Sequence, residues 1–277
     1  MNIAVASGKG GTGKTTIATN LAYLVSHNVT NLQYLDCDVE EPNGHLFLKP
    51  ELTKREKIAL PVPEIDMSKC TSCGLCVKIC QYKAITTIAD KVLVFEELCH
   101  GCGGCKEVCP EKAISETGRE IGVIEYGTAK KIKFIHGKLR IGEAMSPPLI
   151  KKVINMANEK AVNIIDVPPG TSCPVVMSIK NADFVVLVTE PAPFGLNDLE
   201  LAIEMVKKLR LPFGVVVNRH EEGNFNARFF CMKRNVPILT EIPDDRKVAE
   251  SYSEGKLVLE EMPGFGTYFN TLWDKII

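Results

Sequence analysis

The sequence predicts an α/β protein with a mostly parallel sheet, helices on both faces and a small inserted α+β domain. Short apolar segments alternate with amphipathic ones through most of the 277 residues, and this alternation is typical of parallel strands joined by helices. A glycine-rich loop follows the first apolar segment, and eight of the eleven cysteines lie between Cys70 and Cys109. We expect residues 1–60 and 119–277 to form the discontinuous main domain and residues 61–118 to form the insert.

The first predicted elements are a strand at Asn2–Ala6, a helix at Lys14–Ser26 and a strand at Leu32–Leu35. The strands are short apolar runs, whereas the helix has apolar residues at helical spacing. The charged run 51–57 lies between prolines and is expected to be a linker.

Alternating elements resume after the cysteine-rich segment. Prolines 147 and 148 open a helix, and the C-terminal residues from Tyr268 to Ile276 are expected to dock on the core. The predicted strands and helices are 121–126, 131–135, 147–158 (helix), 162–166, 175–180 (helix), 184–188, 196–209 (helix), 214–218, 227–235 (helix), 236–242 and 246–254 (helix).

The composition is that of an ordinary globular protein. The formal net charge is −1, with 45% hydrophobic and 24% charged residues, which gives no global field for nucleic acid or an anionic membrane. No apolar run approaches the roughly 20 residues that span a bilayer, and no secretory signal pattern precedes the glycine-rich loop. We therefore expect a cytoplasmic protein that binds neither nucleic acid nor membrane, with thiols that are reduced.

The glycine-rich loop matches a phosphate-binding motif. Residues 8–15 fit G-x-x-x-x-G-K-S/T between a strand and a helix, a context that disfavours a turn without ligand. Backbone N–H groups can surround phosphate oxygens, and the helix N-terminus adds partial positive charge. Lys14 is expected to reach the β and γ phosphates, and the Thr15 hydroxyl to ligate Mg²⁺. The expected phosphate-binding residues are Gly8, Gly10, Gly11, Thr12, Gly13, Lys14, Thr15 and Thr16.

Lys9 is a second lysine in this loop, which the generic motif does not require. Without further context, Lys9 would be interpreted as an exposed, solvated cation. However, the run from Lys9 to Thr16 resembles the deviant loop of the MinD/ParA/Mrp and nitrogenase iron-protein class of P-loop ATPases. The resemblance implies that Lys9 reaches across a nucleotide-sandwich dimer, formed by two copies or with a paralogue, to the phosphates of the partner.

Two acidic segments carry the same resemblance. Asp36 and Asp38 end the second strand, like the first switch of the class, in which the second aspartate positions the attacking water. Asp166, before Val-Pro-Pro-Gly-Thr, resembles the Walker B aspartate and second switch. The resemblance implies slow or partner-stimulated ATP hydrolysis in which Lys9, Lys14, Asp38 and Asp166 are catalytic.

The same resemblance extends to the metal and the base. Mg²⁺ is expected beside Thr15, Asp36 and Asp166, since carboxylates hold the metal and its waters. Asn218-Arg219 resembles the strand end whose asparagine contacts adenine, and Pro243 lies in a segment similar to the loop that closes over the base.

The cysteines form an internal repeat. Each copy has the spacing Cys-x2-Cys-x2-Cys-x3-Cys, the bacterial ferredoxin pattern in which three cysteines bind one cluster and the fourth binds the other. Structural zinc and disulfides are the alternatives, and the spacing fits zinc poorly. Gln81 stands where the motif usually has proline. The expected ligands are Cys70, Cys73, Cys76 and Cys109 for one [4Fe–4S] cluster, and Cys99, Cys102, Cys105 and Cys80 for the other.

The combination predicts an ATPase that couples ATP-driven dimer closure to electron transfer with a protein partner. The alternative is an iron–sulfur cluster carrier of the Mrp type; such carriers use a C-terminal Cys-x-x-Cys pair, which this chain lacks, since Cys231 stands alone. Less favoured are a positioning ATPase, because no basic face or cationic tail is evident, and an electron carrier with a nucleotide-sensing dimer. Cys173 is expected to be a buried structural side chain, with a redox or metal-binding role as the alternative.

Overall fold

The computed structural model describes residues 1–89 and 91–277. Over these residues the chain divides into a first compact unit, Met1–Arg55, Ile124–Lys138 and Ile150–Ile277, and a second, Glu56–Val123 and Leu139–Leu149. The cysteine repeat lies wholly in the second unit, whose bounds extend beyond the predicted insert, 61–118.

The first unit is built on a sheet whose described strands follow the order β11-β10-β9-β1-β8-β2-β7-β6-β3. The pairs β1–β8, β1–β9, β9–β10, β10–β11, β2–β7 and β2–β8 are all parallel. The strands are β1 (Asn2–Ala6), β2 (Leu32–Asp36), β3 (Glu51–Ile65), β6 (Ile114–Ala129), β7 (Ile132–Leu139), β8 (Val162–Asp166), β9 (Phe184–Thr189), β10 (Phe213–His220) and β11 (Ile238–Pro243).

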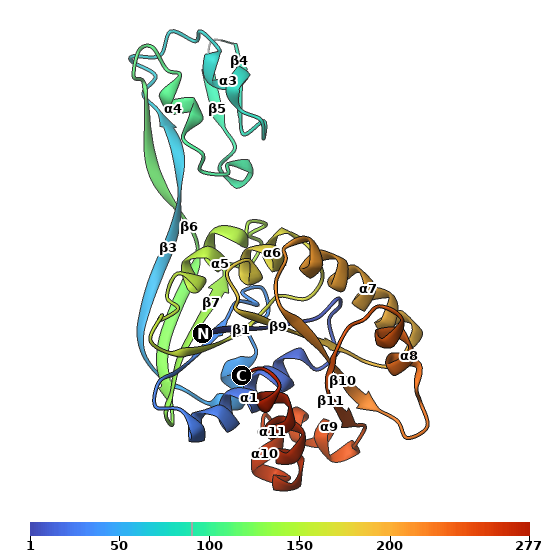
Figure 1. Ribbon diagram of the computed structural model, residues 1–277. Helices are drawn as coiled ribbons and strands as arrows, with labels where there is room; N and C mark the ends of the chain where they lie inside the picture. The colour runs from blue at the N-terminus through green and yellow to red at the C-terminus, as the bar shows by residue number, and fades with distance from the viewer. Residues whose placement is uncertain (90) are drawn as a thin grey trace. The chain divides into compact units, whose positions relative to one another are not determined.

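Helices cover both faces of this sheet. In Figure 1, α1, α9, α10 and α11 lie on one face, and α6 and α7 lie on the other. The predicted mostly parallel α/β architecture is therefore confirmed. The helices of this part of the chain are α1 (Lys14–Asn28), α2 (Gly44–Leu48), α5 (Pro147–Ile154), α6 (Cys173–Ile179), α7 (Pro193–Lys208), α8 (Asn226–Lys233), α9 (Arg246–Ser253), α10 (Val258–Glu261) and α11 (Gly266–Asp274), with the 3₁₀ turn η2 (Pro263–Phe265).

Helix α1 positions the glycine-rich loop. It starts after Gly13, whose φ of 89° is left-handed, and it buries Ile17 and Leu21 in the main core. Phe269 and Leu272 of α11 belong to the same core, which confirms that the C-terminal segment docks there. Fully burying such side chains contributes about 1.5–3 kcal/mol each, so the loop is anchored to a rigid element.

The expectation that residues 51–57 form a linker is wrong, because β3 starts at Glu51. Its charged side chains hid the strand pattern. In the sheet β3 is the last strand in the order, and charged residues are common on edge strands because they discourage pairing with other chains. Lys57 pairs with Glu120 at 2.9 Å, and Arg55 lies 3.7 Å from Glu125, so the charges of β3 are partly satisfied by β6.

Between strands β3 and β6 the second unit contains short elements. They are α3 (Leu75–Ile79), β4 (Ile85–Ile88), β5 (Lys91–Val94), η1 (Glu96–Leu98) and α4 (Gly104–Glu107), and β4 pairs with β5 in antiparallel fashion. Its buried clusters are small and include cysteines, among them Cys76 and Cys99. The clusters around the cysteines bury little apolar surface on their own, so a bound metal would add to the stability of this segment.

The sequence repeat is also a structural repeat. Gly74 and Gly103 precede α3 and α4 with φ values of 74° and 73°. Lys83 and Lys112 also share a left-handed backbone, with φ values of 56° and 49°. Equivalent residues of the two copies therefore adopt the same local conformation.

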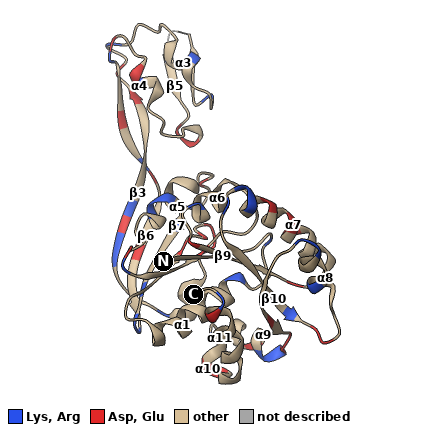
Figure 2. Ribbon diagram, in the orientation of Figure 1, with Lys and Arg blue, Asp and Glu red and all other residues tan. Residues whose placement is uncertain are grey.

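Charges of both signs are interspersed along the ribbon (Figure 2). None of the helices within the described residues has the length and apolar character that a membrane crossing requires.

Candidate nucleotide cleft and cysteine sites

A cleft in the first unit follows the carboxyl ends of the parallel strands, where ligands of open α/β sheets bind. The predicted residues that line it are Gly10, Gly11, Gly13, Lys14, Thr15, Thr16, Asp38, Asn218, Arg219 and Pro243. Gly8, Lys9, Thr12, Asp36 and Asp166 are not among the lining residues.

Lys14 lies at the centre of a buried polar cluster. Its Nζ is 2.6 Å from Oδ1 of Asp166 and 3.4 Å from Oδ2 of Asp38. The hydroxyl of Tyr34 donates to Oδ2 of Asp166 at 2.9 Å. Burial would lower the pKa of Lys14, but Asp166 and Asp38 outweigh burial and raise it. Lys14 is therefore a fixed cation at the end of the loop.

The two predicted first-switch aspartates have different environments. Asp36 is fully buried, and its two oxygens accept hydrogen bonds from the N–H groups of Asp38, at 3.1 Å, and Gly44, at 2.9 Å. Burial and the nearby Asp166 raise the pKa of Asp36 well above its usual range. Asp38 lines the cleft, and burial raises its pKa to about 6. Asp38 is thus the carboxylate that faces the cleft, while Asp36 holds the loop that carries it.

Glycine is required at position 13 for two reasons. Its φ is +89°, and a Cβ there would lie 2.3 Å from Nδ2 of Asn218. That amide nitrogen donates to the carbonyl oxygen of Thr12 at 2.9 Å. Asn218, predicted to contact adenine, is therefore also tied to the phosphate loop.

Lys9 points toward the acidic end of β9. Its Nζ is 2.5 Å from Oε1 of Glu190, and the other carboxylate oxygen of Glu190 is 3.3 Å from Arg219. The sequence reasoning missed Glu190 and Tyr34. For Glu190 the available signal was its position directly after an apolar strand, Phe184–Thr189, whereas the role of Tyr34 depends on the neighbouring strand β8.

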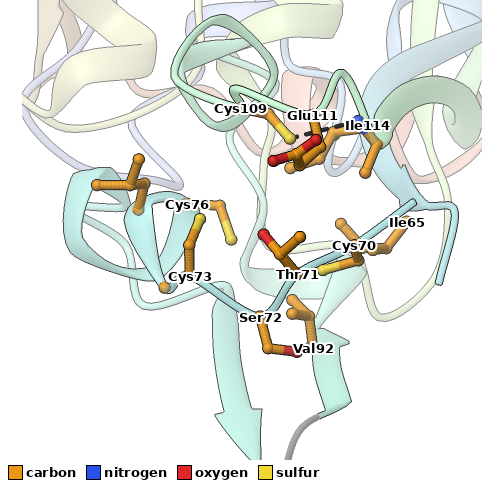
Figure 3. A pocket seen from close by; sticks show the side chains of 13 residues that line it. Ile65, Cys70, Thr71, Ser72, Cys73, Cys76, Val92, Cys109, Glu111 and Ile114 are labelled. Atoms are coloured by element: carbon orange, nitrogen blue, oxygen red, sulfur yellow. Dashed lines mark hydrogen bonds between the residues drawn. The ribbon is translucent and has the colours of Figure 1, made fainter. Parts of the chain in front are cut away.

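Four cysteines surround a cavity in the second unit. Cys70, Cys73, Cys76 and Cys109 line it together with apolar side chains such as Val92. Figure 3 shows the cysteines approaching the space from different sides, with Thr71 and Glu111 beside them. The N–H of Ala113 donates to Sγ of Cys109 at 3.3 Å. We call this the first cysteine site.

The remaining cysteines of the repeat surround another cavity, the second cysteine site. Cys80, Cys99, Cys102 and Cys105 line it. Sγ of Cys80 accepts from the N–H of Ala84 at 3.3 Å, which matches the contact of Cys109 with Ala113 in the other copy. Sγ of Cys99 accepts from the N–H of Gly101 at 3.4 Å.

The cysteine sites have the donor set of cysteine-ligated iron–sulfur clusters. All eleven cysteines are free thiols, and each site places four of them around a cavity that also has apolar walls. In a [4Fe–4S] site each cysteine binds a different iron, so the sulfurs surround a cluster-sized space. N–H groups that donate to the sulfurs are also typical of such sites.

Three cysteines lie outside the repeat. Cys37 and Cys231 are buried, and Cys173 is exposed at the start of α6. Burial raises the pKa of the Cys231 thiol to about 11 and that of Cys37 well above its usual range. The two buried thiols are therefore held protonated as parts of the core.

Comparison with known proteins matches the chain to one family. A model of the CobQ/CobB/MinD/ParA nucleotide binding domain covers residues 3–258. An uncharacterised protein of Methanocaldococcus jannaschii is 32% identical over 94% of this chain and 92% of its own. A protein of Pyrococcus horikoshii named iron-sulfur cluster carrier protein is 26% identical over 99% of this chain and 85% of its own.

Solved structures support the same fold. The septum site-determining protein MinD of Pyrococcus horikoshii, in complex with Mg-ADP, matches with a TM-score of 0.64 and 19% identity, over 99% of this chain and 95% of that chain. This match confirms the predicted P-loop α/β fold class.

Proposed function

The chain belongs to the CobQ/CobB/MinD/ParA family of nucleotide-binding domains, and from this premise we propose that this P-loop ATPase couples ATP-driven closure of a homodimer to electron transfer through two [4Fe–4S] clusters. The second unit is then an inserted ferredoxin-like domain, and the electron partner is another protein in the cytoplasm.

The arrangement of the cysteines carries the proposal. Spacing groups the eight cysteines of the repeat into two interleaved sets of four, and each set lines its own cavity. A thiol set of this kind, with apolar walls and N–H donors to sulfur, is the environment of cysteine-ligated clusters. Bound clusters would supply one-electron redox chemistry, which the side chains of this unit do not provide.

The nucleotide cleft supports the ATPase half. Lys14 and the backbone of residues 10–13 would hold the phosphates, and Thr15 would complete the Mg²⁺ shell through its hydroxyl. Asp38 faces the cleft, where it can orient an attacking water, since phosphoryl transfer depends mainly on positioning and charge. The bound Mg-ADP of the MinD structure is consistent with these roles.

We assign to Lys9 the role of closing the dimer, which forms from two copies of this chain or with a paralogue. In one subunit Lys9 pairs with Glu190, and exchange of this partner for a phosphate of the opposite subunit would make dimerisation depend on ATP. The pairing with Glu190 keeps the lysine ordered near the loop.

A separate cavity in the first unit lies between strand β6 and residues 41–43, which follow the first-switch aspartates in the sequence. Glu41 and Asn43 line the nucleotide cleft and also this cavity, which is lined as well by Glu125 of β6 and His136 of β7. His136 Nε2 lies 2.8 Å from Glu125. Strand β6 continues along the chain into the second unit, and we propose that a movement of residues 41–43 would reach the segment that holds the cysteines along this strand.

An iron–sulfur cluster carrier is the second candidate, and one observation favours it. The Pyrococcus horikoshii relative that aligns with 99% of this chain is named as such a carrier. A carrier releases its clusters to an apo-protein, whereas an electron-transfer protein retains them through many reductions.

The test begins with anaerobically purified protein. We expect about eight iron and eight sulfide per chain, which corresponds to two [4Fe–4S] clusters. Cys76→Ser should lose the cluster of the first site, while Cys173→Ser, a change at an exposed cysteine outside both sites, should keep both. The loaded protein is then mixed with MgATP and either an apo-ferredoxin or a one-electron acceptor. Electron transfer to the acceptor while the iron stays on the protein supports the proposal. Cluster transfer to apo-ferredoxin that is faster than electron transfer favours the carrier.

A further inference from the structure

The two cysteine sites can be compared position by position. Cys70 and Cys99 are 29 residues apart in the repeat, and the same offset relates the walls of the two cavities. Ala113 lines the first site and Ala84 the second; Val92 lines the first and Pro63 the second. Each site is therefore an internal control for the other, and a difference at an equivalent position is a difference in the environment of the bound group.

The largest difference in charge is at the position two residues after the fourth cysteine of each copy. Glu111 lines the first site, whereas its counterpart Tyr82 lines the second. The Tyr82 ring stacks on His100, with centroids 3.4 Å apart and an interplanar angle of 7°. Neither protonation form of His100 adds negative charge, so the first site alone has a carboxylate at this position.

The second site has a carboxylate elsewhere, but a cation neutralises it. Glu116 lines this cavity, and Nζ of Lys106 lies 2.9 Å from its Oε2. Glu111, by contrast, forms no ion pair with any residue in the described part of the chain. The first site thus has an unbalanced negative charge, and the second site does not.

We propose that the two sites accept electrons in a fixed order, the second site before the first. This inference rests on the proposed function, because it requires a cluster at each site. A one-electron donor such as dithionite supplies the electron, no bond is made or broken, and the reduced site gains one negative charge. The carboxylate of Glu111 opposes this added charge at the first site. The cluster of the first site therefore has the lower midpoint potential of the two.

The experiment is an anaerobic redox titration followed by electron paramagnetic resonance on the full chain. Glu111→Gln should raise the lower midpoint and leave the upper one unchanged. Lys106→Gln frees the charge of Glu116 and should lower the upper midpoint. Glu97→Gln removes an exposed carboxylate that lines neither cavity and should leave both midpoints unchanged. Because the charges are exposed, added salt should also narrow the gap between the two midpoints.

The results separate this inference from the proposed function. The inference is overturned if Glu111→Gln shifts the upper midpoint, shifts both equally or shifts neither while both clusters are present. If iron and sulfide analysis of the wild-type protein shows that clusters are absent from the repeat, the proposed function fails first, and this inference fails with it.

Discussion

Nζ of Lys14 lies 2.6 Å from Oδ1 of Asp166, and the side chains of both residues are buried, with exposed fractions of 7% and 0%. A buried ion pair of this kind depends on both partners, since removal of one leaves an uncompensated charge. The pair joins the start of α1 to the end of β8, so the phosphate loop and strand β8 are fixed to each other.

Replacement of Lys14 by Ala should therefore affect both catalysis and stability. Without the lysine the developing charge on the phosphates loses its main donor, and loss of one such donor typically costs about 10²–10³ in rate. Asp166 loses its buried partner, which should lower the free energy of unfolding by about 3 kcal/mol or more. Steady-state ATP hydrolysis and denaturant unfolding measure the two effects. A variant that hydrolyses ATP at the wild-type rate would show that Lys14 has no catalytic role.

Two neighbouring glycines of the loop should respond differently to substitution. Gly13→Ala puts a Cβ 2.3 Å from Nδ2 of Asn218 at a φ of +89°, and the left-handed backbone alone costs about 1–2 kcal/mol. We expect lower stability and weaker MgATP binding. Gly10→Ala is the matched control for stability alone, because a Cβ at Gly10 meets no neighbouring atom within 4 Å while Gly10 itself lines the cleft. Thermal unfolding compares the two variants, and equal losses of stability in both would contradict the assigned role of Gly13.

Lys9→Ala should separate dimerisation from nucleotide binding. Lys9 does not line the cleft of its own subunit, so we expect the variant to bind a non-hydrolysable ATP analogue with nearly unchanged affinity but to remain monomeric. Light scattering after size-exclusion chromatography measures the mass with and without the analogue. Lys208→Ala, at the exposed end of α7, is the control for removal of a surface lysine. If the Lys9 variant dimerises with the analogue as readily as the wild-type protein does, Lys9 has no role in dimerisation.

Asp38 should make the stability of the nucleotide-free protein depend on pH. Burial raises the pKa of Asp38 to about 6 in the folded state, against an ordinary value of about 3.9. The folded carboxyl therefore binds its proton more tightly than the unfolded one, and stability falls as pH rises toward and through 6. Relative to Asp38→Asn, the wild type should lose about 1 kcal/mol between pH 5 and pH 7. Urea unfolding at the two pH values measures this difference, and a pH-independent difference would contradict the assignment.

Local signals made much of the fold predictable. The strand Val162–Asp166 was predicted with the bounds that the structure has, because a strand buried on both faces is a short, mostly apolar run bounded by loops. The phosphate loop and the cysteine spacing are local patterns as well. In the structure most of the loop residues line one cleft, and each set of four cysteines lines one cavity. Strand β3 was missed because the charged residues of its exposed edge hide the alternation of a strand.

Tertiary contacts account for what the sequence does not reveal. Glu190 and Tyr34 come close to Lys9 and Asp166 only because strands distant in the sequence lie side by side in the sheet. The sequence resemblance implied a Mg²⁺ role for Asp36 and a catalytic role for Asp38, but the two environments depend on the fold. Only the fold shows that Asp36 accepts backbone hydrogen bonds and that Asp38 lines the cleft.

The central claim is that nucleotide binding in the first unit changes the redox behaviour of the second. The most direct test is an anaerobic titration of the midpoint potentials without nucleotide, with ADP and with a non-hydrolysable ATP analogue. We predict that the analogue shifts at least one midpoint by roughly 60 mV, which for a one-electron couple is about 1.4 kcal/mol of coupling. Identical midpoints in the three states, with both clusters present and nucleotide bound, would contradict the claim and favour the cluster-carrier function.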